Sequence, residues 1–133
     1  MGLVRFASPV RLLPTPATAR LVGTLDRIAQ ELDIDLVVTS AAENMGRLPA
    51  DPHPRGQAID IRTKDMPDET ILAVYSRAKA LLGPLWTVLF EGPTSHPNMK
   101  LAAVQYVNPK ATGFHFHWQI KKGLPDFGSM EQR

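Results

Sequence analysis

Residues 114–120 (FHFHWQI) alternate strictly between large apolar side chains and polar ones. An alternation of period two is typical of a β-strand that has one covered face and one open face. The four apolar side chains of this strand would enter a core, while His115, His117 and Gln119 would share the opposite face. The segment therefore predicts a sheet that is covered on one side and carries two histidines on the other.

The remaining periodic segments predict two helices and several more strands. Apolar residues spaced three and four apart predict a helix over residues 18–32, and Pro67 and Gly83 bracket a second helix. Strands are expected at residues 36–39, 58–62, 85–91, 100–107 and 114–120, with a loop composition over residues 40–54. Because helices and strands do not alternate regularly, this order predicts the α+β fold class, with a small central, mainly antiparallel sheet flanked by two helices.

The length of 133 residues fits a single domain over residues 1–133, with residues 1–16 as an N-terminal extension and residues 121–133 as a polar tail. The absence of cysteine restricts any metal site to nitrogen and oxygen ligands. The longest mostly apolar stretch, residues 80–90, is too short for a membrane span. We expect no signal peptide and no membrane partner, because residues 1–13 lack an uninterrupted apolar segment.

A second group of chemically informative residues lies in the segment HPRGQAID, residues 53–60. His53 ends a proline-rich loop and Asp60 lies in the following strand, so an imidazole and a carboxylate can approach a common point across the turn. Nitrogen and oxygen ligands of the type His, Asp and His, with one position left for water, match a catalytic zinc site. The alternative is that these side chains are structural, as we expect for His96, which we interpret as a loop residue.

The pattern His-x-x-Gly-x-Ala-x-Asp, formed by His53, Gly56, Ala58 and Asp60 and followed by His-x-His, resembles the hedgehog/D-Ala-D-Ala metallopeptidase superfamily. This group includes D-Ala-D-Ala carboxypeptidases, phage endolysins, murein endopeptidases and the zinc domain of hedgehog proteins. The resemblance covers about residues 37–120. It implies a hedgehog/DD-peptidase-like fold and one Zn²⁺ ion, whose ligands would be His53, Asp60 and His117.

The resemblance also implies two catalytic roles. His115 would lie beside the metal and contact the reacting group. Carboxypeptidase-type members place a glutamate three residues before a histidine of the last strand, but Thr112 and Phe114 occupy those positions here. The segment VLFE, which ends at Glu91, resembles a strand that in other members runs directly into His-x-His, with residues 92–113 inserted here as a hairpin. Glu91 is therefore the candidate general base, and the alternative is a strand-end acid without a catalytic role.

Two further departures from the family pattern concern substrate binding. Asp51 stands where the family usually has serine, and Glu43 stands where many members have an arginine that holds a substrate carboxylate. We expect substrate contacts from three other side chains near the site, Arg47, Arg55 and Gln57.

The implied function is zinc-dependent hydrolysis of peptide bonds in peptidoglycan stem or cross-bridge peptides that contain D-amino acids. The alternative is a catalytically inactive zinc-binding domain used for cell-wall binding or assembly. A third and weaker option, a nucleic-acid binder, rests only on the isoelectric point of about 9.2. We expect a monomer that is made in the cytoplasm and acts at the cell wall, as a phage lysis protein or a virion-associated protein would.

Overall fold

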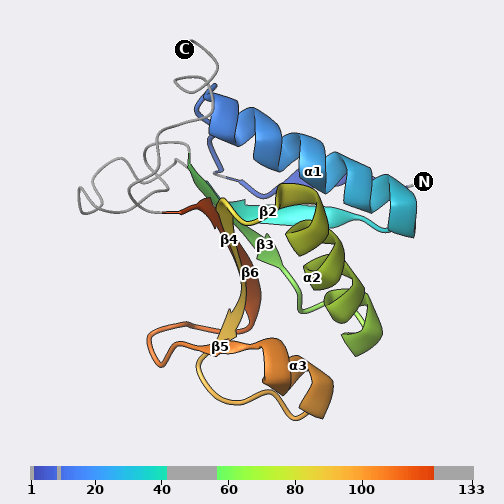
Figure 1. The fold of residues 1–133 in the computed structure, drawn as a ribbon, viewed down its shortest axis with the longest axis vertical. Coiled ribbons are helices and arrows are strands. Elements are labelled where there is room, and N and C mark those ends of the chain that lie inside the picture. Colours follow the sequence, from blue (N-terminus) through green and yellow to red (C-terminus); the bar gives the residue numbers. More distant parts are fainter. Residues whose placement is uncertain (1, 9, 42–56, 122–133) are drawn as a thin grey trace.

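The structure, a computed structural model, describes residues 2–8, 10–41 and 57–121. These residues form an α+β fold with three helices and one six-stranded mixed sheet, in the order β1-β2-β3-β6-β4-β5 (Figure 1). The α+β class predicted from the order of the elements is confirmed. The strands are β1 (Val4–Phe6), β2 (Leu36–Ser40), β3 (Ala58–Arg62), β4 (Trp86–Gly92), β5 (Tyr106–Val107) and β6 (His115–Ile120).

The sheet is antiparallel in its centre and parallel at its two edges. Strand β6 lies between β3 and β4 and is antiparallel to both, and β2 is antiparallel to β3. Strand β1 adds to β2, and β5 adds to β4, in the parallel direction. The segment 1–16, expected as an extension, thus supplies an edge strand. Just before this strand, the backbone amide of Leu3 donates a hydrogen bond to Oδ1 of Asp35 at 3.0 Å.

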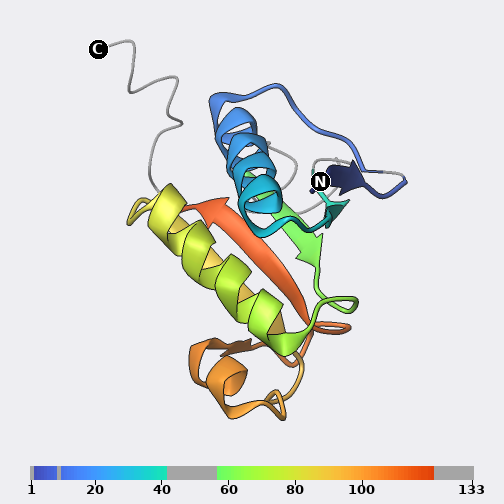
Figure 2. The ribbon, with the colours of Figure 1, turned by 90° about the vertical axis from the view of Figure 1, so that its right-hand side faces the viewer.

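Helices α1 (Pro16–Leu32) and α2 (Asp68–Leu82) cover the same face of the sheet (Figure 2). Helix α1 begins two residues before the predicted position, because the side chain of Thr15 caps it and Pro16 suits its first turn. Helix α2 carries Asp68 and Glu69 in its first turn, where negative charge is favourable, and ends at Leu82, directly before Gly83, as predicted. No helix in the described ranges combines the length and apolar character that a bilayer crossing requires.

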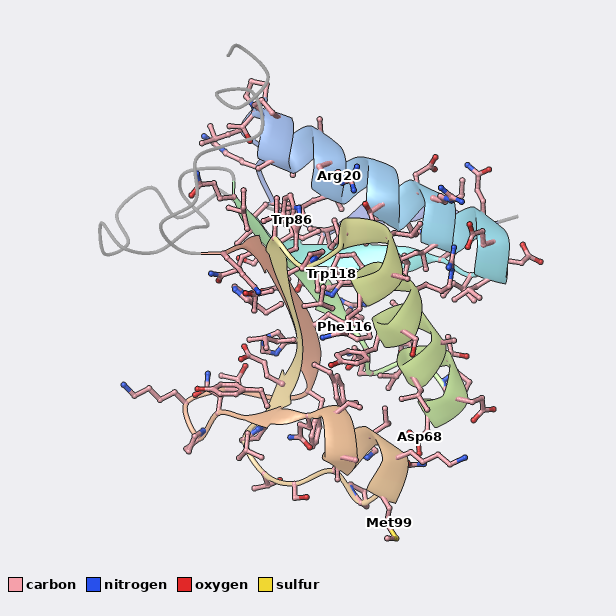
Figure 3. The ribbon with its side chains drawn as sticks, viewed as in Figure 1. Arg20, Asp68, Trp86, Met99, Phe116 and Trp118 are labelled. Atoms are coloured by element: carbon pink, nitrogen blue, oxygen red, sulfur yellow. The ribbon has the colours of Figure 1, made fainter. Side chains whose placement is uncertain are left out.

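The core lies between this helical layer and the covered face of the sheet. Phe116 and Trp118 are fully buried, and their side chains extend from β6 toward α2 (Figure 3). Ile59 and Ile61 of β3 and the even-numbered residues of β4 are buried on the same face. The predicted division of residues 114–120 into a core face and an open face is confirmed, because the burial of β6 alternates along its whole length.

The region between β4 and β6 differs from the prediction. A strand was expected at residues 100–107 and a hairpin over residues 92–113, but the structure has a short helix, α3 (Met99–Val104), followed by the two-residue strand β5. Asn98 caps this helix by accepting hydrogen bonds from the backbone amides of Lys100 and Leu101. The cap and the burial of Leu101 explain why this apolar run becomes a helix and not a strand.

Gly92, the last residue of β4, is in close contact with an aromatic ring that precedes the two histidines. A Cβ atom at Gly92 would lie 2.3 Å from the ring of Phe114. This ring stacks on Phe90, with ring centroids 5.8 Å apart, and meets His96 edge-on at 4.9 Å. The carbonyl of Phe114 accepts a hydrogen bond from the buried hydroxyl of Thr63. The start of β6 is therefore fixed on two sides.

We expect Gly92→Ala to lower the free energy of unfolding by about 1–3 kcal/mol, because the aromatic stack must move to admit the methyl group. Gly23→Ala is the matched control. Gly23 lies inside α1 and a Cβ there would meet nothing within 4 Å, so alanine should stabilise the protein by about 0.5–1 kcal/mol. Urea unfolding of both variants measures the difference, and equal stabilities would contradict this packing.

Candidate metal centre

The open face of the sheet carries two histidines and two carboxylates around β6, and Arg62 of β3 lies opposite His115 on the same face. The register places Asp60 of β3 directly opposite His117, and Glu91 of β4 directly opposite His115. Directly paired residues of an antiparallel ladder project from the same face of the sheet, with Cβ atoms about 5 Å apart. Two carboxylates thus lie on either side of the histidine strand, on the face that the helices leave open.

Asp60, His117 and Gln119 form a chain of contacts on this face. Nδ1 of His117 lies 2.8 Å from Oδ1 of Asp60, and Nε2 lies 2.5 Å from Oε1 of Gln119. The side chains of Asp60 and His117 are 21% and 14% exposed, so solvent reaches the pair without surrounding it. Burial by itself lowers the pKa of His117, but the hydrogen bond and the negative charge of Asp60 outweigh it, and this pKa is raised.

The orientation of Gln119 determines where His117 carries its proton. An amide oxygen can only accept, so Nε2 of His117 donates to Gln119. In a neutral imidazole, Nδ1 would then present a lone pair to the carboxylate oxygen of Asp60. Two acceptors at 2.8 Å require a proton or a metal ion between them. With Gln119 in this orientation, the Asp60–His117 pair is suited to hold a cation.

Glu91 and His115 form a second pair on the same face. Oε1 of Glu91 lies 2.8 Å from Nε2 of His115, and Nδ1 of His115 lies 3.2 Å from the carbonyl oxygen of Gly113. The hydrogen bond from His115 lowers the pKa of Glu91, and the same bond raises the pKa of His115. The pair is therefore a charge-assisted hydrogen bond between a carboxylate and an imidazolium.

The structure brings four of the predicted site residues together and leaves others untested. Asp60, His117, His115 and Glu91 meet on one face, whereas the candidates His53, Arg47 and Arg55 lie outside the described residues. Within the described ranges, no group of three or more His, Cys, Asp or Glu side chains is arranged to hold a metal ion. Two of the three predicted ligands are thus placed, and the position of the third is not described.

One further histidine and two glutamines complete the comparison with the sequence. His96 lies in the loop after β4, as predicted, where its Nδ1 accepts a hydrogen bond from the backbone amide of Asn98. The backbone carbonyl of Gln57 accepts from the amide of Ile120, so its main chain extends the pairing of β3 with β6. The contact of Gln119 with His117 was not predicted, although the alternation of residues 114–120 already placed it on the histidine face.

No protein-family model matches the chain, and neither curated proteins nor solved structures include a match. The geometry of this face and the pattern of the sequence are therefore the features that bear on function.

We expect Glu91 and His115 to stabilise the folded protein as a coupled pair. In a double-mutant cycle with Glu91→Gln and His115→Gln on the metal-free protein, the coupling free energy should be about 1 kcal/mol, because both side chains are mostly buried and hydrogen-bonded to each other. Urea unfolding of the four proteins measures it. Effects that add to within about 0.3 kcal/mol would show that the contact does not contribute.

Proposed function

We propose that the chain is a zinc-dependent peptidase that hydrolyses peptide bonds of peptidoglycan. One observation carries this proposal: the Asp60–His117 pair, which is suited to hold a cation, lies beside the Glu91–His115 pair on the open face of one sheet. A metal ligand set and a carboxylate base on one face are the components of a metallopeptidase site.

The chemistry of the described donors fits zinc. Imidazole nitrogen and carboxylate oxygen are common zinc ligands, and the chain has no cysteine to compete for the ion. Two ligand atoms that each lie about 2 Å from one ion must lie within about 4 Å of each other, and Oδ1 of Asp60 is 2.8 Å from Nδ1 of His117. These two residues would hold the zinc together with His53, which lies outside the described residues. Gln119 would orient His117 by accepting from its Nε2.

When bound, the zinc ion supplies a Lewis acid that polarises the scissile carbonyl and makes a water molecule more acidic. The side chains perform the remaining tasks. Glu91 takes a proton from the attacking water and gives it to the leaving amine, so that one C–N bond breaks and a carboxylate and an amine are released. His115 directs the Glu91 carboxylate through their 2.8 Å contact, while its other ring nitrogen faces the carbonyl oxygen of Gly113. Donation to the oxyanion of the tetrahedral intermediate, a contribution of about 3 kcal/mol in comparable sites, would require His115 to exchange one of these two acceptors for the substrate.

The substrate class comes from the sequence pattern. The spacing of His53, Gly56, Ala58 and Asp60 before His-x-His resembles the hedgehog/D-Ala-D-Ala metallopeptidase superfamily, many of whose members act on peptides with D-amino acids. The antiparallel centre of the sheet and the two helices on one face are compatible with a hedgehog/DD-peptidase-like fold. In this proposal the protein acts as a monomer at the cell wall, in the manner of a phage lysis or virion-associated protein.

One observation favours a second function, a zinc-binding domain that attaches to the cell wall without cutting it. The Glu91 carboxylate is already bonded to His115, and the chain lacks a glutamate three residues before either histidine of β6. If the Glu91 carboxylate stays bonded to His115 and does not contact the attacking water, it stabilises the fold and takes no part in hydrolysis. Measurement of hydrolysis decides between the two functions.

We expect the purified chain to hold one zinc ion and His117→Ala to lose it. Bound metal stabilises the folded state by mass action, so EDTA should lower the melting temperature of the unaltered chain and leave that of the variant unchanged. Elemental analysis and thermal unfolding measure both effects. His96→Ala is the control, because His96 lies in a separate loop and should retain the zinc. Equal zinc content in His117→Ala and the unaltered chain would contradict the ligand assignment.

We expect Glu91→Gln to keep its zinc and to release peptidoglycan fragments about 10²–10⁴ times more slowly, because the amide cannot accept the proton of the attacking water. Mass spectrometry of digested peptidoglycan measures the rate. Glu69→Gln, which makes the same change on the exposed surface of α2, is the control. An unchanged rate in Glu91→Gln would exclude Glu91 as the base. No release by the zinc-loaded unaltered chain would establish the non-hydrolytic function.

A further inference from the structure

The outer edge of β4 is only partly paired. Strand β5 pairs with Glu91 and Gly92 at one end of β4, and no described strand pairs with residues 87–90 on that side (Figure 1). An open strand edge presents a row of backbone donors and acceptors to which another extended chain can add. The edge lies within the sheet that carries the candidate metal centre.

Two hydrogen bonds show which backbone groups of β4 face outward. The amide of Lys121 donates to the carbonyl of Leu85, so the odd-numbered residues of β4 bond to β6. The amide of Asn108 donates to the carbonyl of Gly92, so the even-numbered residues face the opposite side. The N–H and C=O groups of Val88 therefore both point away from β6, into the unpaired part of the edge.

A groove of about 570 Å³ borders this part of the edge. Its lining includes Thr87, Val88 and Leu89 of β4, together with Lys79 and Lys121. Among the described residues that line it there are two lysines and no carboxylate, so the groove favours a ligand with negative charge.

Two residues that line the groove are direct ladder partners of the candidate metal centre. Leu89, which lines the groove, lies directly opposite His117 in the β4–β6 ladder and projects from the same open face. Thr87, another lining residue, lies opposite Gln119 in the same way. A chain bound along the edge would thus lie beside β4, the strand that carries Glu91 and pairs with the histidine strand.

We propose that this groove binds an extended peptide, which pairs with the backbone of Val88 and directs a carboxylate toward Lys79 and Lys121. The identification of the occupant as a peptidoglycan stem peptide rests on the proposed function, whereas the groove, the open edge and the two lysines do not. Pairing through one residue's N–H and C=O needs only one extended residue of the ligand. The edge can therefore accept a peptide that contains D-amino acids.

The direct test measures amide hydrogen exchange at Val88. Zinc-loaded Glu91→Gln, which should bind without cutting, is mixed with the synthetic stem pentapeptide L-Ala-γ-D-Glu-L-Lys-D-Ala-D-Ala. We expect the amide of Val88 to exchange at least about tenfold more slowly with the peptide, because a new hydrogen bond protects it. The amide of Leu89, which points toward β6, is the internal control and should change little. An unchanged exchange rate at Val88 under saturating peptide would overturn the proposal.

The charge requirement is tested with matched substitutions. Lys79→Gln and Lys121→Gln should each weaken peptide binding by about threefold, whereas Lys100→Gln, on the exposed surface of α3, should leave the affinity unchanged. The same peptide with its carboxyl groups amidated should lose most of this dependence on the two lysines. Equal losses in all three variants would show a general charge effect and contradict the proposed site.

One other occupant would also overturn the proposal. If exchange at Val88 slows with protein concentration and not with peptide, a second copy of the chain adds to the edge. If the unaltered chain hydrolyses peptidoglycan but the peptide does not protect Val88, the peptidase function stands and the groove proposal fails. If the peptide protects Val88 but no hydrolysis is found, the groove proposal stands and the peptidase function fails.

Discussion

The candidate site depends on the position of β6 between β3 and β4 in one fixed register. That register places an acid on each side of the histidine strand, Asp60 beside His117 and Glu91 beside His115. A shift of one residue would turn both histidines into the core and Phe116 and Trp118 out to solvent. The burial of the two aromatic side chains, which are inaccessible to solvent, therefore maintains the same register that brings the ionisable groups together.

The arrangement separates stability from chemistry by face. Helices α1 and α2 cover the aromatic face, and the described helices leave open the opposite face, which carries the two histidines and the two carboxylates (Figure 2). On that open face the contacts are polar and join side chains of neighbouring strands or of one strand: His117 contacts Asp60 and Gln119, and His115 contacts Glu91. A metal ion bound there would be reached by substrate from the open side, next to the groove along the outer edge of β4.

The sequence predicted those parts of the fold that follow from local periodicity. The strand over residues 114–120, the strand over residues 58–62 and both long helices were found, because each has a clear pattern and recognisable end signals. The helix at Met99–Val104 was missed, because it depends on the burial of Leu101 as well as on the cap at Asn98. The local sequence pattern does not reveal that burial. Strand β1 was not predicted apart from the N-terminal extension over residues 1–16, because its pairing with β2 is a long-range contact.

The candidate site could be predicted as a set of residues but not as a geometry. The pairing of Glu91 with His115 spans 23 intervening residues that contain α3 and β5, so sequence spacing gave no distance between them. The contact of Gln119 with His117 required only the alternation of β6, and it shows that a polar residue on the open face of a histidine strand should be included in the site. The predicted ligand His53 remains a prediction from the motif.

X-ray diffraction from crystals grown with zinc, measured at the zinc absorption edge, tests the central claim most directly. We expect an anomalous peak about 2.0–2.2 Å from both Nδ1 of His117 and Oδ1 of Asp60. A zinc-loaded crystal with no peak at this position, in which Nδ1 of His117 remains hydrogen-bonded to Asp60, would contradict it.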